Sequence, residues 1–130
     1  METTSKHFRK RNAILTCLQQ TCLHPSAEEV HRMLQAEHPD ISLATVYRNL
    51  SLFKQQGIIQ SLGTVNGIER FDANTQPHVH FVCTGCDSVI DLPEVSVPFE
   101  LGTPAEASTG CRIQGCQLTF SGKCSSCQNQ

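Results

Sequence analysis

The fold of this chain is decided by residues 42–71, whose sequence is SLATVYRNLSLFKQQGIIQSLGTVNGIERF. Its first part carries apolar residues at helical spacing and ends at Gly57, a residue type that commonly terminates helices. Residues 58–62 and 68–71 are then predicted to form two short strands, because each contains apolar residues and together they flank Asn66-Gly67, a favoured hairpin turn. The segment therefore predicts a helix followed by a β-hairpin.

Two further helices are predicted ahead of this segment. One covers residues 7–20, and the other begins after Ser26 and ends before Pro39. Ser26 and Glu29 have the spacing of a capping box, which satisfies two of the free amides at a helix start. Three helices followed by a hairpin form a winged helix, in which the third helix enters the DNA major groove.

The third predicted helix has a polar face opposite its apolar stripe. This face carries Thr45 and Arg48, with Tyr47 at its flank. Arginine can recognise guanine, and threonine or tyrosine can contact phosphate or a thymine methyl group. Because exposed helix faces are usually only solvated, the face alone does not establish DNA binding.

Charge is distributed unevenly although the net charge is only −2. Residues 1–60 carry seven Lys or Arg against five Asp or Glu, whereas residues 61–130 carry three against seven. A basic half beside an acidic half is typical of a polyanion-binding module joined to a metal-binding one. The basic cluster near the N-terminus could equally be an ordinary solvated helix end.

Two Cys-x-x-Cys pairs lie in the C-terminal half of the chain. They are the donor set of a structural Zn²⁺ site, formed by Cys83, Cys86, Cys124 and Cys127. Disulfides are the alternative. Residues 1–6 lack the apolar core of a signal peptide, and no apolar run is long enough to cross a membrane. We therefore expect a cytoplasmic protein, and the reducing cytosol favours metal over disulfides.

The C-terminal half is predicted to be a small α/β domain. We expect strands at 78–83, 88–92 and 111–120 and a short helix at 104–108. The polar residues 73–77 are predicted to be a hinge. The expected organisation is α+β, with a winged-helix domain at 1–72, the hinge at 73–77 and a metal-binding domain at 78–130.

A second metal site is predicted around His78 and His80. Alternate residues of a strand project from the same face, so the two imidazoles can bind one ion. Asp91 lies on a nearby predicted strand and Asp72 at the exit of the hairpin, and such a donor set suits Fe²⁺, Mn²⁺ or Zn²⁺. His24 could add a fifth donor, or it could be a capping or surface residue.

Several motifs together resemble the ferric uptake regulator family of metal-dependent repressors over residues 11–127. They are His24-Pro25-Ser26-Ala27-Glu28-Glu29, Ser42-Leu43-Ala44-Thr45-Val46-Tyr47-Arg48-Asn49-Leu50, Arg70-Phe71-Asp72, His78-Val79-His80, Cys83-Thr84-Gly85-Cys86 and Cys124-Ser125-Ser126-Cys127. The resemblance implies a winged helix joined to an α/β dimerisation domain, a homodimer, and a double-stranded DNA operator containing an inverted repeat.

The resemblance also implies roles for individual residues. Structural zinc would be held by the four paired cysteines, and the regulatory ion, Fe²⁺ or Mn²⁺, by His24, Asp72, His78, His80 and Asp91. The candidate DNA-binding residues are Arg11, Thr45, Tyr47, Arg48 and Asn49. An ion bound by all five regulatory donors would hold the two halves in one orientation and fix the spacing of the dimer's recognition helices.

Aspartate at positions 72 and 91 makes the chain most like the peroxide-sensing branch of the family. In that branch, bound iron reacts with peroxide and oxidises a ligand histidine. Two departures stand out: Pro77 replaces a ligand that some relatives place before His78, and residues 114–116 lack the histidine of a further metal site. That further site is expected to be absent, and Cys111 and Cys116 are expected to be buried or redox-active.

Three other functions fit parts of the sequence. A repressor of the same architecture could sense the availability of iron, zinc or manganese without a redox step. A small zinc hydrolase could use the open metal position to activate water, but no general base is available apart from the ligands, so we expect no enzyme. The third alternative is an interaction module that is stabilised by structural zinc and has no affinity for DNA.

Overall fold

The computed structural model describes residues 2–128 and divides the chain into two compact units, 1–75 and 76–130. The boundary between the two units lies within the polar segment 73–77. Each unit has its own secondary structure, and the two are described separately below.

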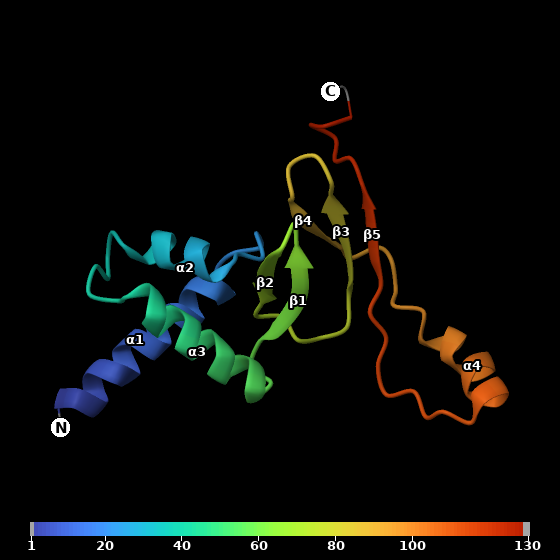
Figure 1. Cartoon of the computed structure of the whole chain (residues 1–130), viewed down its shortest axis with the longest axis horizontal. Coiled ribbons are helices and arrows are strands. Elements are labelled where there is room, and N and C mark those ends of the chain that lie inside the picture. The colour runs from blue at the N-terminus through green and yellow to red at the C-terminus, as the bar shows by residue number, and fades with distance from the viewer. Residues whose placement is uncertain (1, 129–130) are drawn as a thin grey trace. The chain divides into compact units, whose positions relative to one another are not determined.

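The first unit contains three helices followed by a hairpin, in the order α1 (Glu2–Gln19), α2 (Ala27–Leu34), α3 (Leu43–Gln55), β1 (Gln60–Val65) and β2 (Ile68–Asp72). The helices pack together and the hairpin follows the end of α3 (Figure 1). This order confirms the winged helix. Its core is a single apolar cluster made by Ile14, Leu18, Ala27, Val30, Leu34, Ile41, Val46, Leu50, Phe53, Ile59 and Phe71.

Local sequence explains where these helices begin. The Ser26 side chain accepts a hydrogen bond from the Glu29 amide, and the Glu29 side chain accepts one from the Ser26 amide, which completes the predicted capping box. At the start of α3, the Ser42 hydroxyl accepts from the Thr45 amide. Both caps fix the direction in which the chain enters a helix.

The strand expected at 58–62 is wrong in its bounds, because β1 covers Gln60–Val65. Gly57 adopts a left-handed conformation, with φ of 74°, and the amides of Ile58 and Ile59 both donate to the Phe53 carbonyl. These residues therefore belong to the C-terminal cap of α3, and the strand begins only after them. The predicted turn is present, since Asn66 and Gly67 both have positive φ, as a type I′ turn requires.

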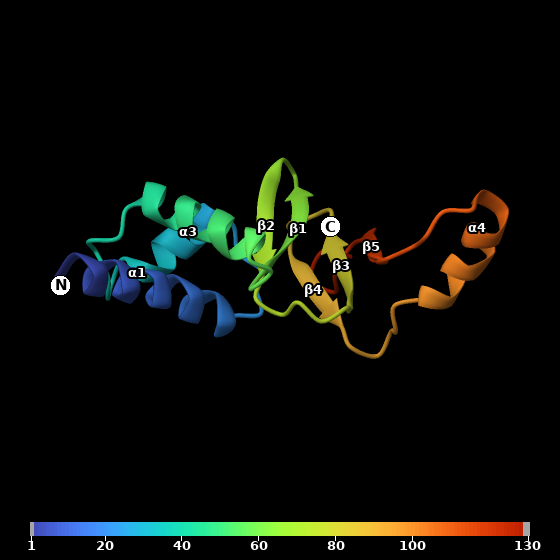
Figure 2. The same ribbon diagram turned by 90° about the horizontal axis from the view of Figure 1, so that it is seen from below.

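The second unit is built on a three-stranded sheet in the order β4 (Val89–Leu92), β3 (Val79–Cys83) and β5 (Thr119–Gly122). The central strand β3 pairs antiparallel with β4 and parallel with β5. A 3₁₀ turn (Phe99–Leu101) leads into α4 (Gly102–Thr109), which stands away from the sheet in both ribbon views (Figures 1 and 2). The α4 helix is longer than the five residues expected.

The strand expected at 111–120 is also wrong, because only Thr119–Gly122 is a strand. Thr119 is paired with His80, and in this register the residues before Leu118 would have to pair with the chain ahead of β3. That chain contains Pro77, which has no amide hydrogen to donate to a ladder. Residues 111–118 therefore follow α4 as an irregular segment in which Cys111 is exposed and Cys116 half-buried.

Candidate metal centres and nucleic-acid interface

Four cysteine side chains meet in the second unit. Cys83 ends β3 and Cys86 lies in the turn that follows it, while Cys124 and Cys127 come directly after β5. Because β3 and β5 are parallel neighbours, their ends bring the two pairs together, and all four sulfurs lie within 4.8 Å of one another.

The arrangement of the sulfurs fits tetrahedral zinc. Sulfurs bound at about 2.3 Å in a tetrahedral site lie about 3.8 Å apart, and the Cys86 and Cys124 sulfurs are 3.9 Å apart. Backbone amides of Gly85 and Cys124 each donate to the Cys83 sulfur over 3.3 Å. Such donors stabilise a thiolate, which is the form that binds zinc.

The same hydrogen bonds change the acidity of the thiols. The amide of Cys124 is the main cause that lowers the pKa of Cys83 to about 6, and the hydroxyl of Ser88 helps lower the pKa of Cys86. In contrast, hydrogen bonding to the Cys124 thiol is the main cause that raises the pKa of Cys127 to about 12. Four neighbouring sulfurs cannot all carry a negative charge without a cation, so a divalent ion suits this site.

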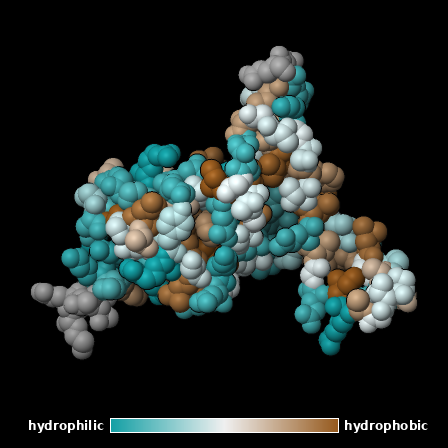
Figure 3. Space-filling view, viewed as in Figure 1, coloured by the Kyte–Doolittle hydropathy of each residue, from teal (hydrophilic) through white to brown (hydrophobic). Residues whose placement is uncertain are grey.

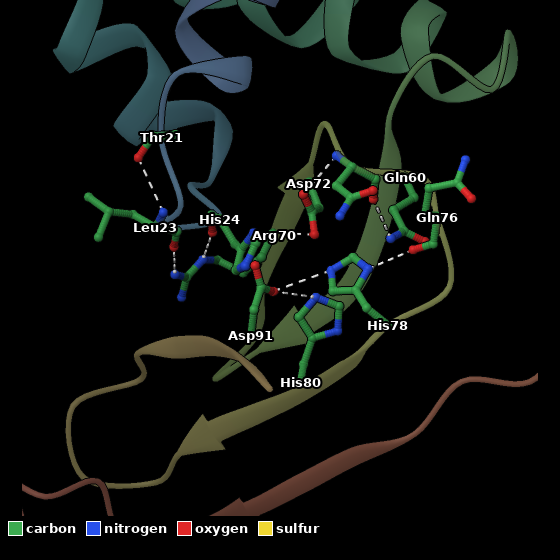
Figure 4. A network of polar contacts seen from close by, with 11 residues as sticks. Thr21, Leu23, His24, Gln60, Arg70, Asp72, Gln76, His78, His80 and Asp91 are labelled. Carbon is green, nitrogen blue, oxygen red and sulfur yellow. Dashed lines mark hydrogen bonds and ion pairs between the residues drawn. The ribbon is translucent and has the colours of Figure 1, made fainter. Parts of the chain in front are cut away.

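The second unit also brings together three of the predicted regulatory donors. The Asp91 Oδ1 atom lies 3.3 Å from His78 Nε2 and 3.2 Å from His80 Nε2 (Figure 4). His80 and Asp91 are direct partners in the β3–β4 ladder, which explains why the two side chains meet. Two ligand atoms that each lie about 2.1 Å from one divalent ion are about 3.0–3.5 Å apart, so the spacing fits a shared metal.

The first unit pairs the other two predicted donors. His24 Nδ1 lies 3.5 Å from Asp72 Oδ2, and both side chains are buried. His24 precedes the capping box of α2, and Asp72 ends β2. A buried imidazole beside a buried carboxylate is a donor pair of the type that Fe²⁺, Mn²⁺ and Zn²⁺ accept.

The candidate DNA-binding residues lie on α1 and α3. A hollow of about 380 Å³ between these helices is lined by His7, Phe8, Lys10, Arg11, Thr45, Arg48, Asn49 and Leu52. Arg48 is exposed, and its guanidinium contacts the Thr45 hydroxyl at 3.4 Å. Three Lys or Arg side chains at one hollow suit a phosphate backbone.

The other candidates are already engaged within the unit. The Arg11 guanidinium stacks 5.4 Å from the centre of the Phe53 ring, and the Asn49 amide donates to the Thr45 carbonyl at 2.9 Å. The exposed Tyr47 donates its hydroxyl hydrogen to Glu28, on the neighbouring helix α2. Arg11 and Asn49 are therefore held in place within the unit.

Two further residues support these sites and received no individual role from the sequence. Arg70 in β2 is buried and donates to the carbonyls of Leu23 and His24. Gly85 lies so close to Cys127 that an added Cβ would be 3.0 Å from its sulfur. The arginine of the Arg70-Phe71-Asp72 motif and the glycine inside a Cys-x-x-Cys pair were the available signals.

None of the helices in the described part of the chain combines the length and apolar character needed to cross a bilayer.

Comparison with known proteins identifies the family that shares this architecture. The model of the Ferric uptake regulator family matches residues 2–121. The chain is 33% identical over 123 residues to the peroxide-responsive repressor PerR of Staphylococcus aureus, covering 93% of this chain and 81% of that protein.

Solved structures give the same result. The Campylobacter jejuni peroxide stress regulator has a TM-score of 0.77 and 27% identity, covering 97% of this chain and 94% of that one. The Vibrio cholerae ferric uptake regulator has a TM-score of 0.73 and 34% identity, covering 88% of each chain. The family match, with the winged helix and the cysteine cluster, shows that this chain belongs to the ferric uptake regulator family.

Proposed function

We propose that this protein is a metal-dependent transcriptional repressor that binds a double-stranded DNA operator as a homodimer and responds to peroxide. The observation that carries the proposal is the pairing of donors in each unit, His24 with Asp72 and both His78 and His80 with Asp91. Similarity to PerR of Staphylococcus aureus supports the peroxide response.

The two kinds of donor set suggest two kinds of ion. Four thiolates with no open position suit structural Zn²⁺ at Cys83, Cys86, Cys124 and Cys127. Imidazole and carboxylate donors suit Fe²⁺ or Mn²⁺, which we assign to His24, Asp72, His78, His80 and Asp91. The regulatory donors belong to both units, so one shared ion would fix the orientation of the DNA-binding unit.

The peroxide response follows from the same donors. Bound Fe²⁺ supplies the chemistry by which hydrogen peroxide oxidises a ligand histidine, whereas Mn²⁺ does not. The three histidines would supply nitrogen donors to such an ion, and the two aspartates would supply negative charge. An oxidised imidazole is a weaker donor, so the two units would lose their common orientation and the operator would be released.

The DNA-binding surface is assigned to the third helix and its basic neighbours. The exposed Tyr47 and Arg48 would contact DNA from α3, with Thr45 beside them. Arg11 and Asn49, which also line the hollow between α1 and α3, would contribute to the same surface. In winged helices of this kind, the third helix enters the major groove and the hairpin contacts the backbone.

The homodimer is supported by exposed apolar side chains in the second unit. Phe99, Leu101, Ile113 and Phe120 are between 41% and 66% exposed, and apolar atoms are visible over the region of α4 (Figure 3). Apolar surface of this kind marks an interaction face, and a symmetric pair is the commonest assembly. A dimer would present two recognition helices to an inverted repeat.

Selection from a random duplex DNA library tests the proposed function. The zinc-loaded full chain is held without oxygen, with and without added Mn²⁺, and the retained DNA is sequenced. We expect an inverted repeat to be enriched only with Mn²⁺. Equal enrichment without Mn²⁺ would contradict metal-dependent repression. Retention of no DNA under either condition would favour an interaction module instead.

A repressor of the same family that senses metal availability is the second candidate. The imidazole and carboxylate donors accept Fe²⁺, Mn²⁺ and Zn²⁺, and the chain is 27% identical to a manganese uptake regulator solved with bound zinc. Such a repressor would bind the operator in the same way, yet hydrogen peroxide would not release the iron-loaded protein. Operator binding after peroxide treatment distinguishes the two candidates.

A further inference from the structure

Arg70 holds the loop that carries His24. Its Nε–H donates to the His24 carbonyl, and its Nη2–H donates to the Leu23 carbonyl over 2.8 Å (Figure 4). The next residue adds a third hydrogen bond, since the Phe71 amide donates to the Pro25 carbonyl over 3.1 Å. Strand β2 therefore donates hydrogen bonds to three consecutive carbonyls of the segment that leads into α2.

The segment that accepts these hydrogen bonds has an unfavourable backbone conformation at His24. His24 has a φ of 51°, which places a residue other than glycine in the left-handed region. Such a conformation persists where the surroundings enforce it, and it is concentrated at functional sites. The donors from β2 reach the backbone of His24, so the conformation is held without using its imidazole in those bonds.

The geometry of β2 links these hydrogen bonds to the candidate metal donors His24 and Asp72. Arg70 and Asp72 are two positions apart in a strand, so both side chains project from the same face. On that face Arg70 fixes the His24 backbone, and the Asp72 carboxylate lies 3.5 Å from the His24 imidazole. One strand thus sets both the position of the loop and the distance between the two donors.

Arg70 also has a structural contact. Its Nε lies 4.0 Å from a carboxylate oxygen of Glu29, which belongs to the capping box of α2. If the role of Arg70 were purely structural, replacing it would lower the stability of the winged helix and nothing else. A positioning role predicts an additional effect on metal affinity that depends on His24.

We propose that Arg70 is a positioning residue for the regulatory ion, which holds His24 in the conformation that presents its imidazole beside Asp72. This inference rests on the proposed function, because it requires His24 to be a metal donor. Residues that orient metal ligands affect affinity about 10–100-fold when removed.

The test measures Mn²⁺ binding to the zinc-loaded full chain without oxygen, using the electron paramagnetic resonance signal of free Mn²⁺. The variants are Arg70→Met, His24→Ala and the two combined, with Arg32→Met as a matched control, because Arg32 is exposed on α2 of the same unit. Arg70→Lys keeps the charge and most of the stem, and it provides a less disruptive second variant. Far-ultraviolet circular dichroism and zinc content establish that each variant is folded.

We expect Arg70→Met to weaken Mn²⁺ binding about tenfold or more, with Arg70→Lys weakened in the same direction and Arg32→Met unchanged. In the His24→Ala background, Arg70→Met should have no further effect. Wild-type affinity in both folded Arg70 variants would overturn the inference, as would an undiminished effect of Arg70→Met without His24. If the wild-type chain binds no Mn²⁺ beyond its zinc, the proposed function itself fails.

Discussion

At the scale of single residues, close approaches set the geometry of the cysteine site. Gly85 lies between Cys83 and Cys86, and its backbone is packed against Cys127. An added methyl group would meet both the sulfur at 3.0 Å and the Cβ of Cys127 at 3.1 Å. The glycine is needed here for space, and its φ is not in the left-handed region.

Gly85→Ala should therefore weaken zinc binding. The methyl group has to displace Cys127 or the turn, which costs about 1–3 kcal/mol for overpacking of this kind. The measurement is competition for zinc with a coloured chelator. Gly115→Ala is the matched control, because nothing lies within 4 Å of a Cβ added there. Equal zinc affinity in the two variants would contradict the close approach.

The acidity of Cys83 makes a second prediction at this scale. Its pKa is lowered to about 6, chiefly by the Cys124 amide, so the thiolate persists at neutral pH. Since the pKa is depressed in the folded chain, the contribution to stability is present at high pH and is lost as pH falls through about 6. Zinc should be retained at pH 7 and released in acid below about pH 6, as followed with a zinc-sensitive dye. Release that is already complete at pH 7 would be inconsistent with this environment.

At the scale of elements, periodicity and capping predicted the first unit well. Ser26 caps its helix as expected, and the predicted Asn66-Gly67 turn is present. The start of β1 was misjudged because apolar residues such as Ile58 and Ile59 suit both a strand and a helix cap. Only their hydrogen bonds to the Phe53 carbonyl show that they belong to the cap of α3.

The second unit was less predictable at this scale. Apolar residues at 111–120 resemble a strand, but a strand also needs a partner, and the five residues of β3 are too few to pair with the whole of that segment. The contacts of Arg70 with the His24 loop join residues 46 positions apart, and local sequence does not specify such contacts. The candidate donors His78 and His80 could be proposed from sequence, because two histidines two positions apart in a predicted strand project together.

Helix α3 makes the prediction that belongs to this scale. Arg48→Ala should weaken operator binding by about 1–3 kcal/mol, because an arginine on the recognition face reads bases or phosphates. Fluorescence anisotropy with the selected duplex measures the effect, and Arg32→Ala provides the control for removing one positive charge. A loss no greater than that of Arg32→Ala would remove Arg48 from the interface.

At the scale of the whole molecule, the two units depend on different sources of stability. The first has an apolar cluster of eleven buried residues among those described. In the second, the buried apolar side chains in the described range are Val79 and Val89, together with Cys83 and Cys127 of the cysteine site. Structural zinc contributes about 10–16 kcal/mol in small domains, so it should dominate the stability of the second unit.

Removal of zinc should therefore unfold the second unit and leave the first helical. Chelation at neutral pH is expected to abolish amide exchange protection in β3 and β5 while protection in α3 persists, as hydrogen exchange with mass spectrometry would show. Simultaneous loss of protection in both units would contradict independent stability. Cys124→Ser should reproduce the effect of chelation, and Cys22→Ser, at an exposed cysteine of the first unit, should not.

The central claim is that the proposed regulatory ion makes this repressor respond to peroxide. Peptide mass spectrometry tests it most directly, on the full chain loaded with Fe²⁺ without oxygen, treated with stoichiometric hydrogen peroxide and compared with a Mn²⁺-loaded control. We predict one added oxygen on His24, His78 or His80 in the iron sample alone. Unmodified histidines in the iron sample would contradict peroxide sensing and leave a repressor that senses metal availability.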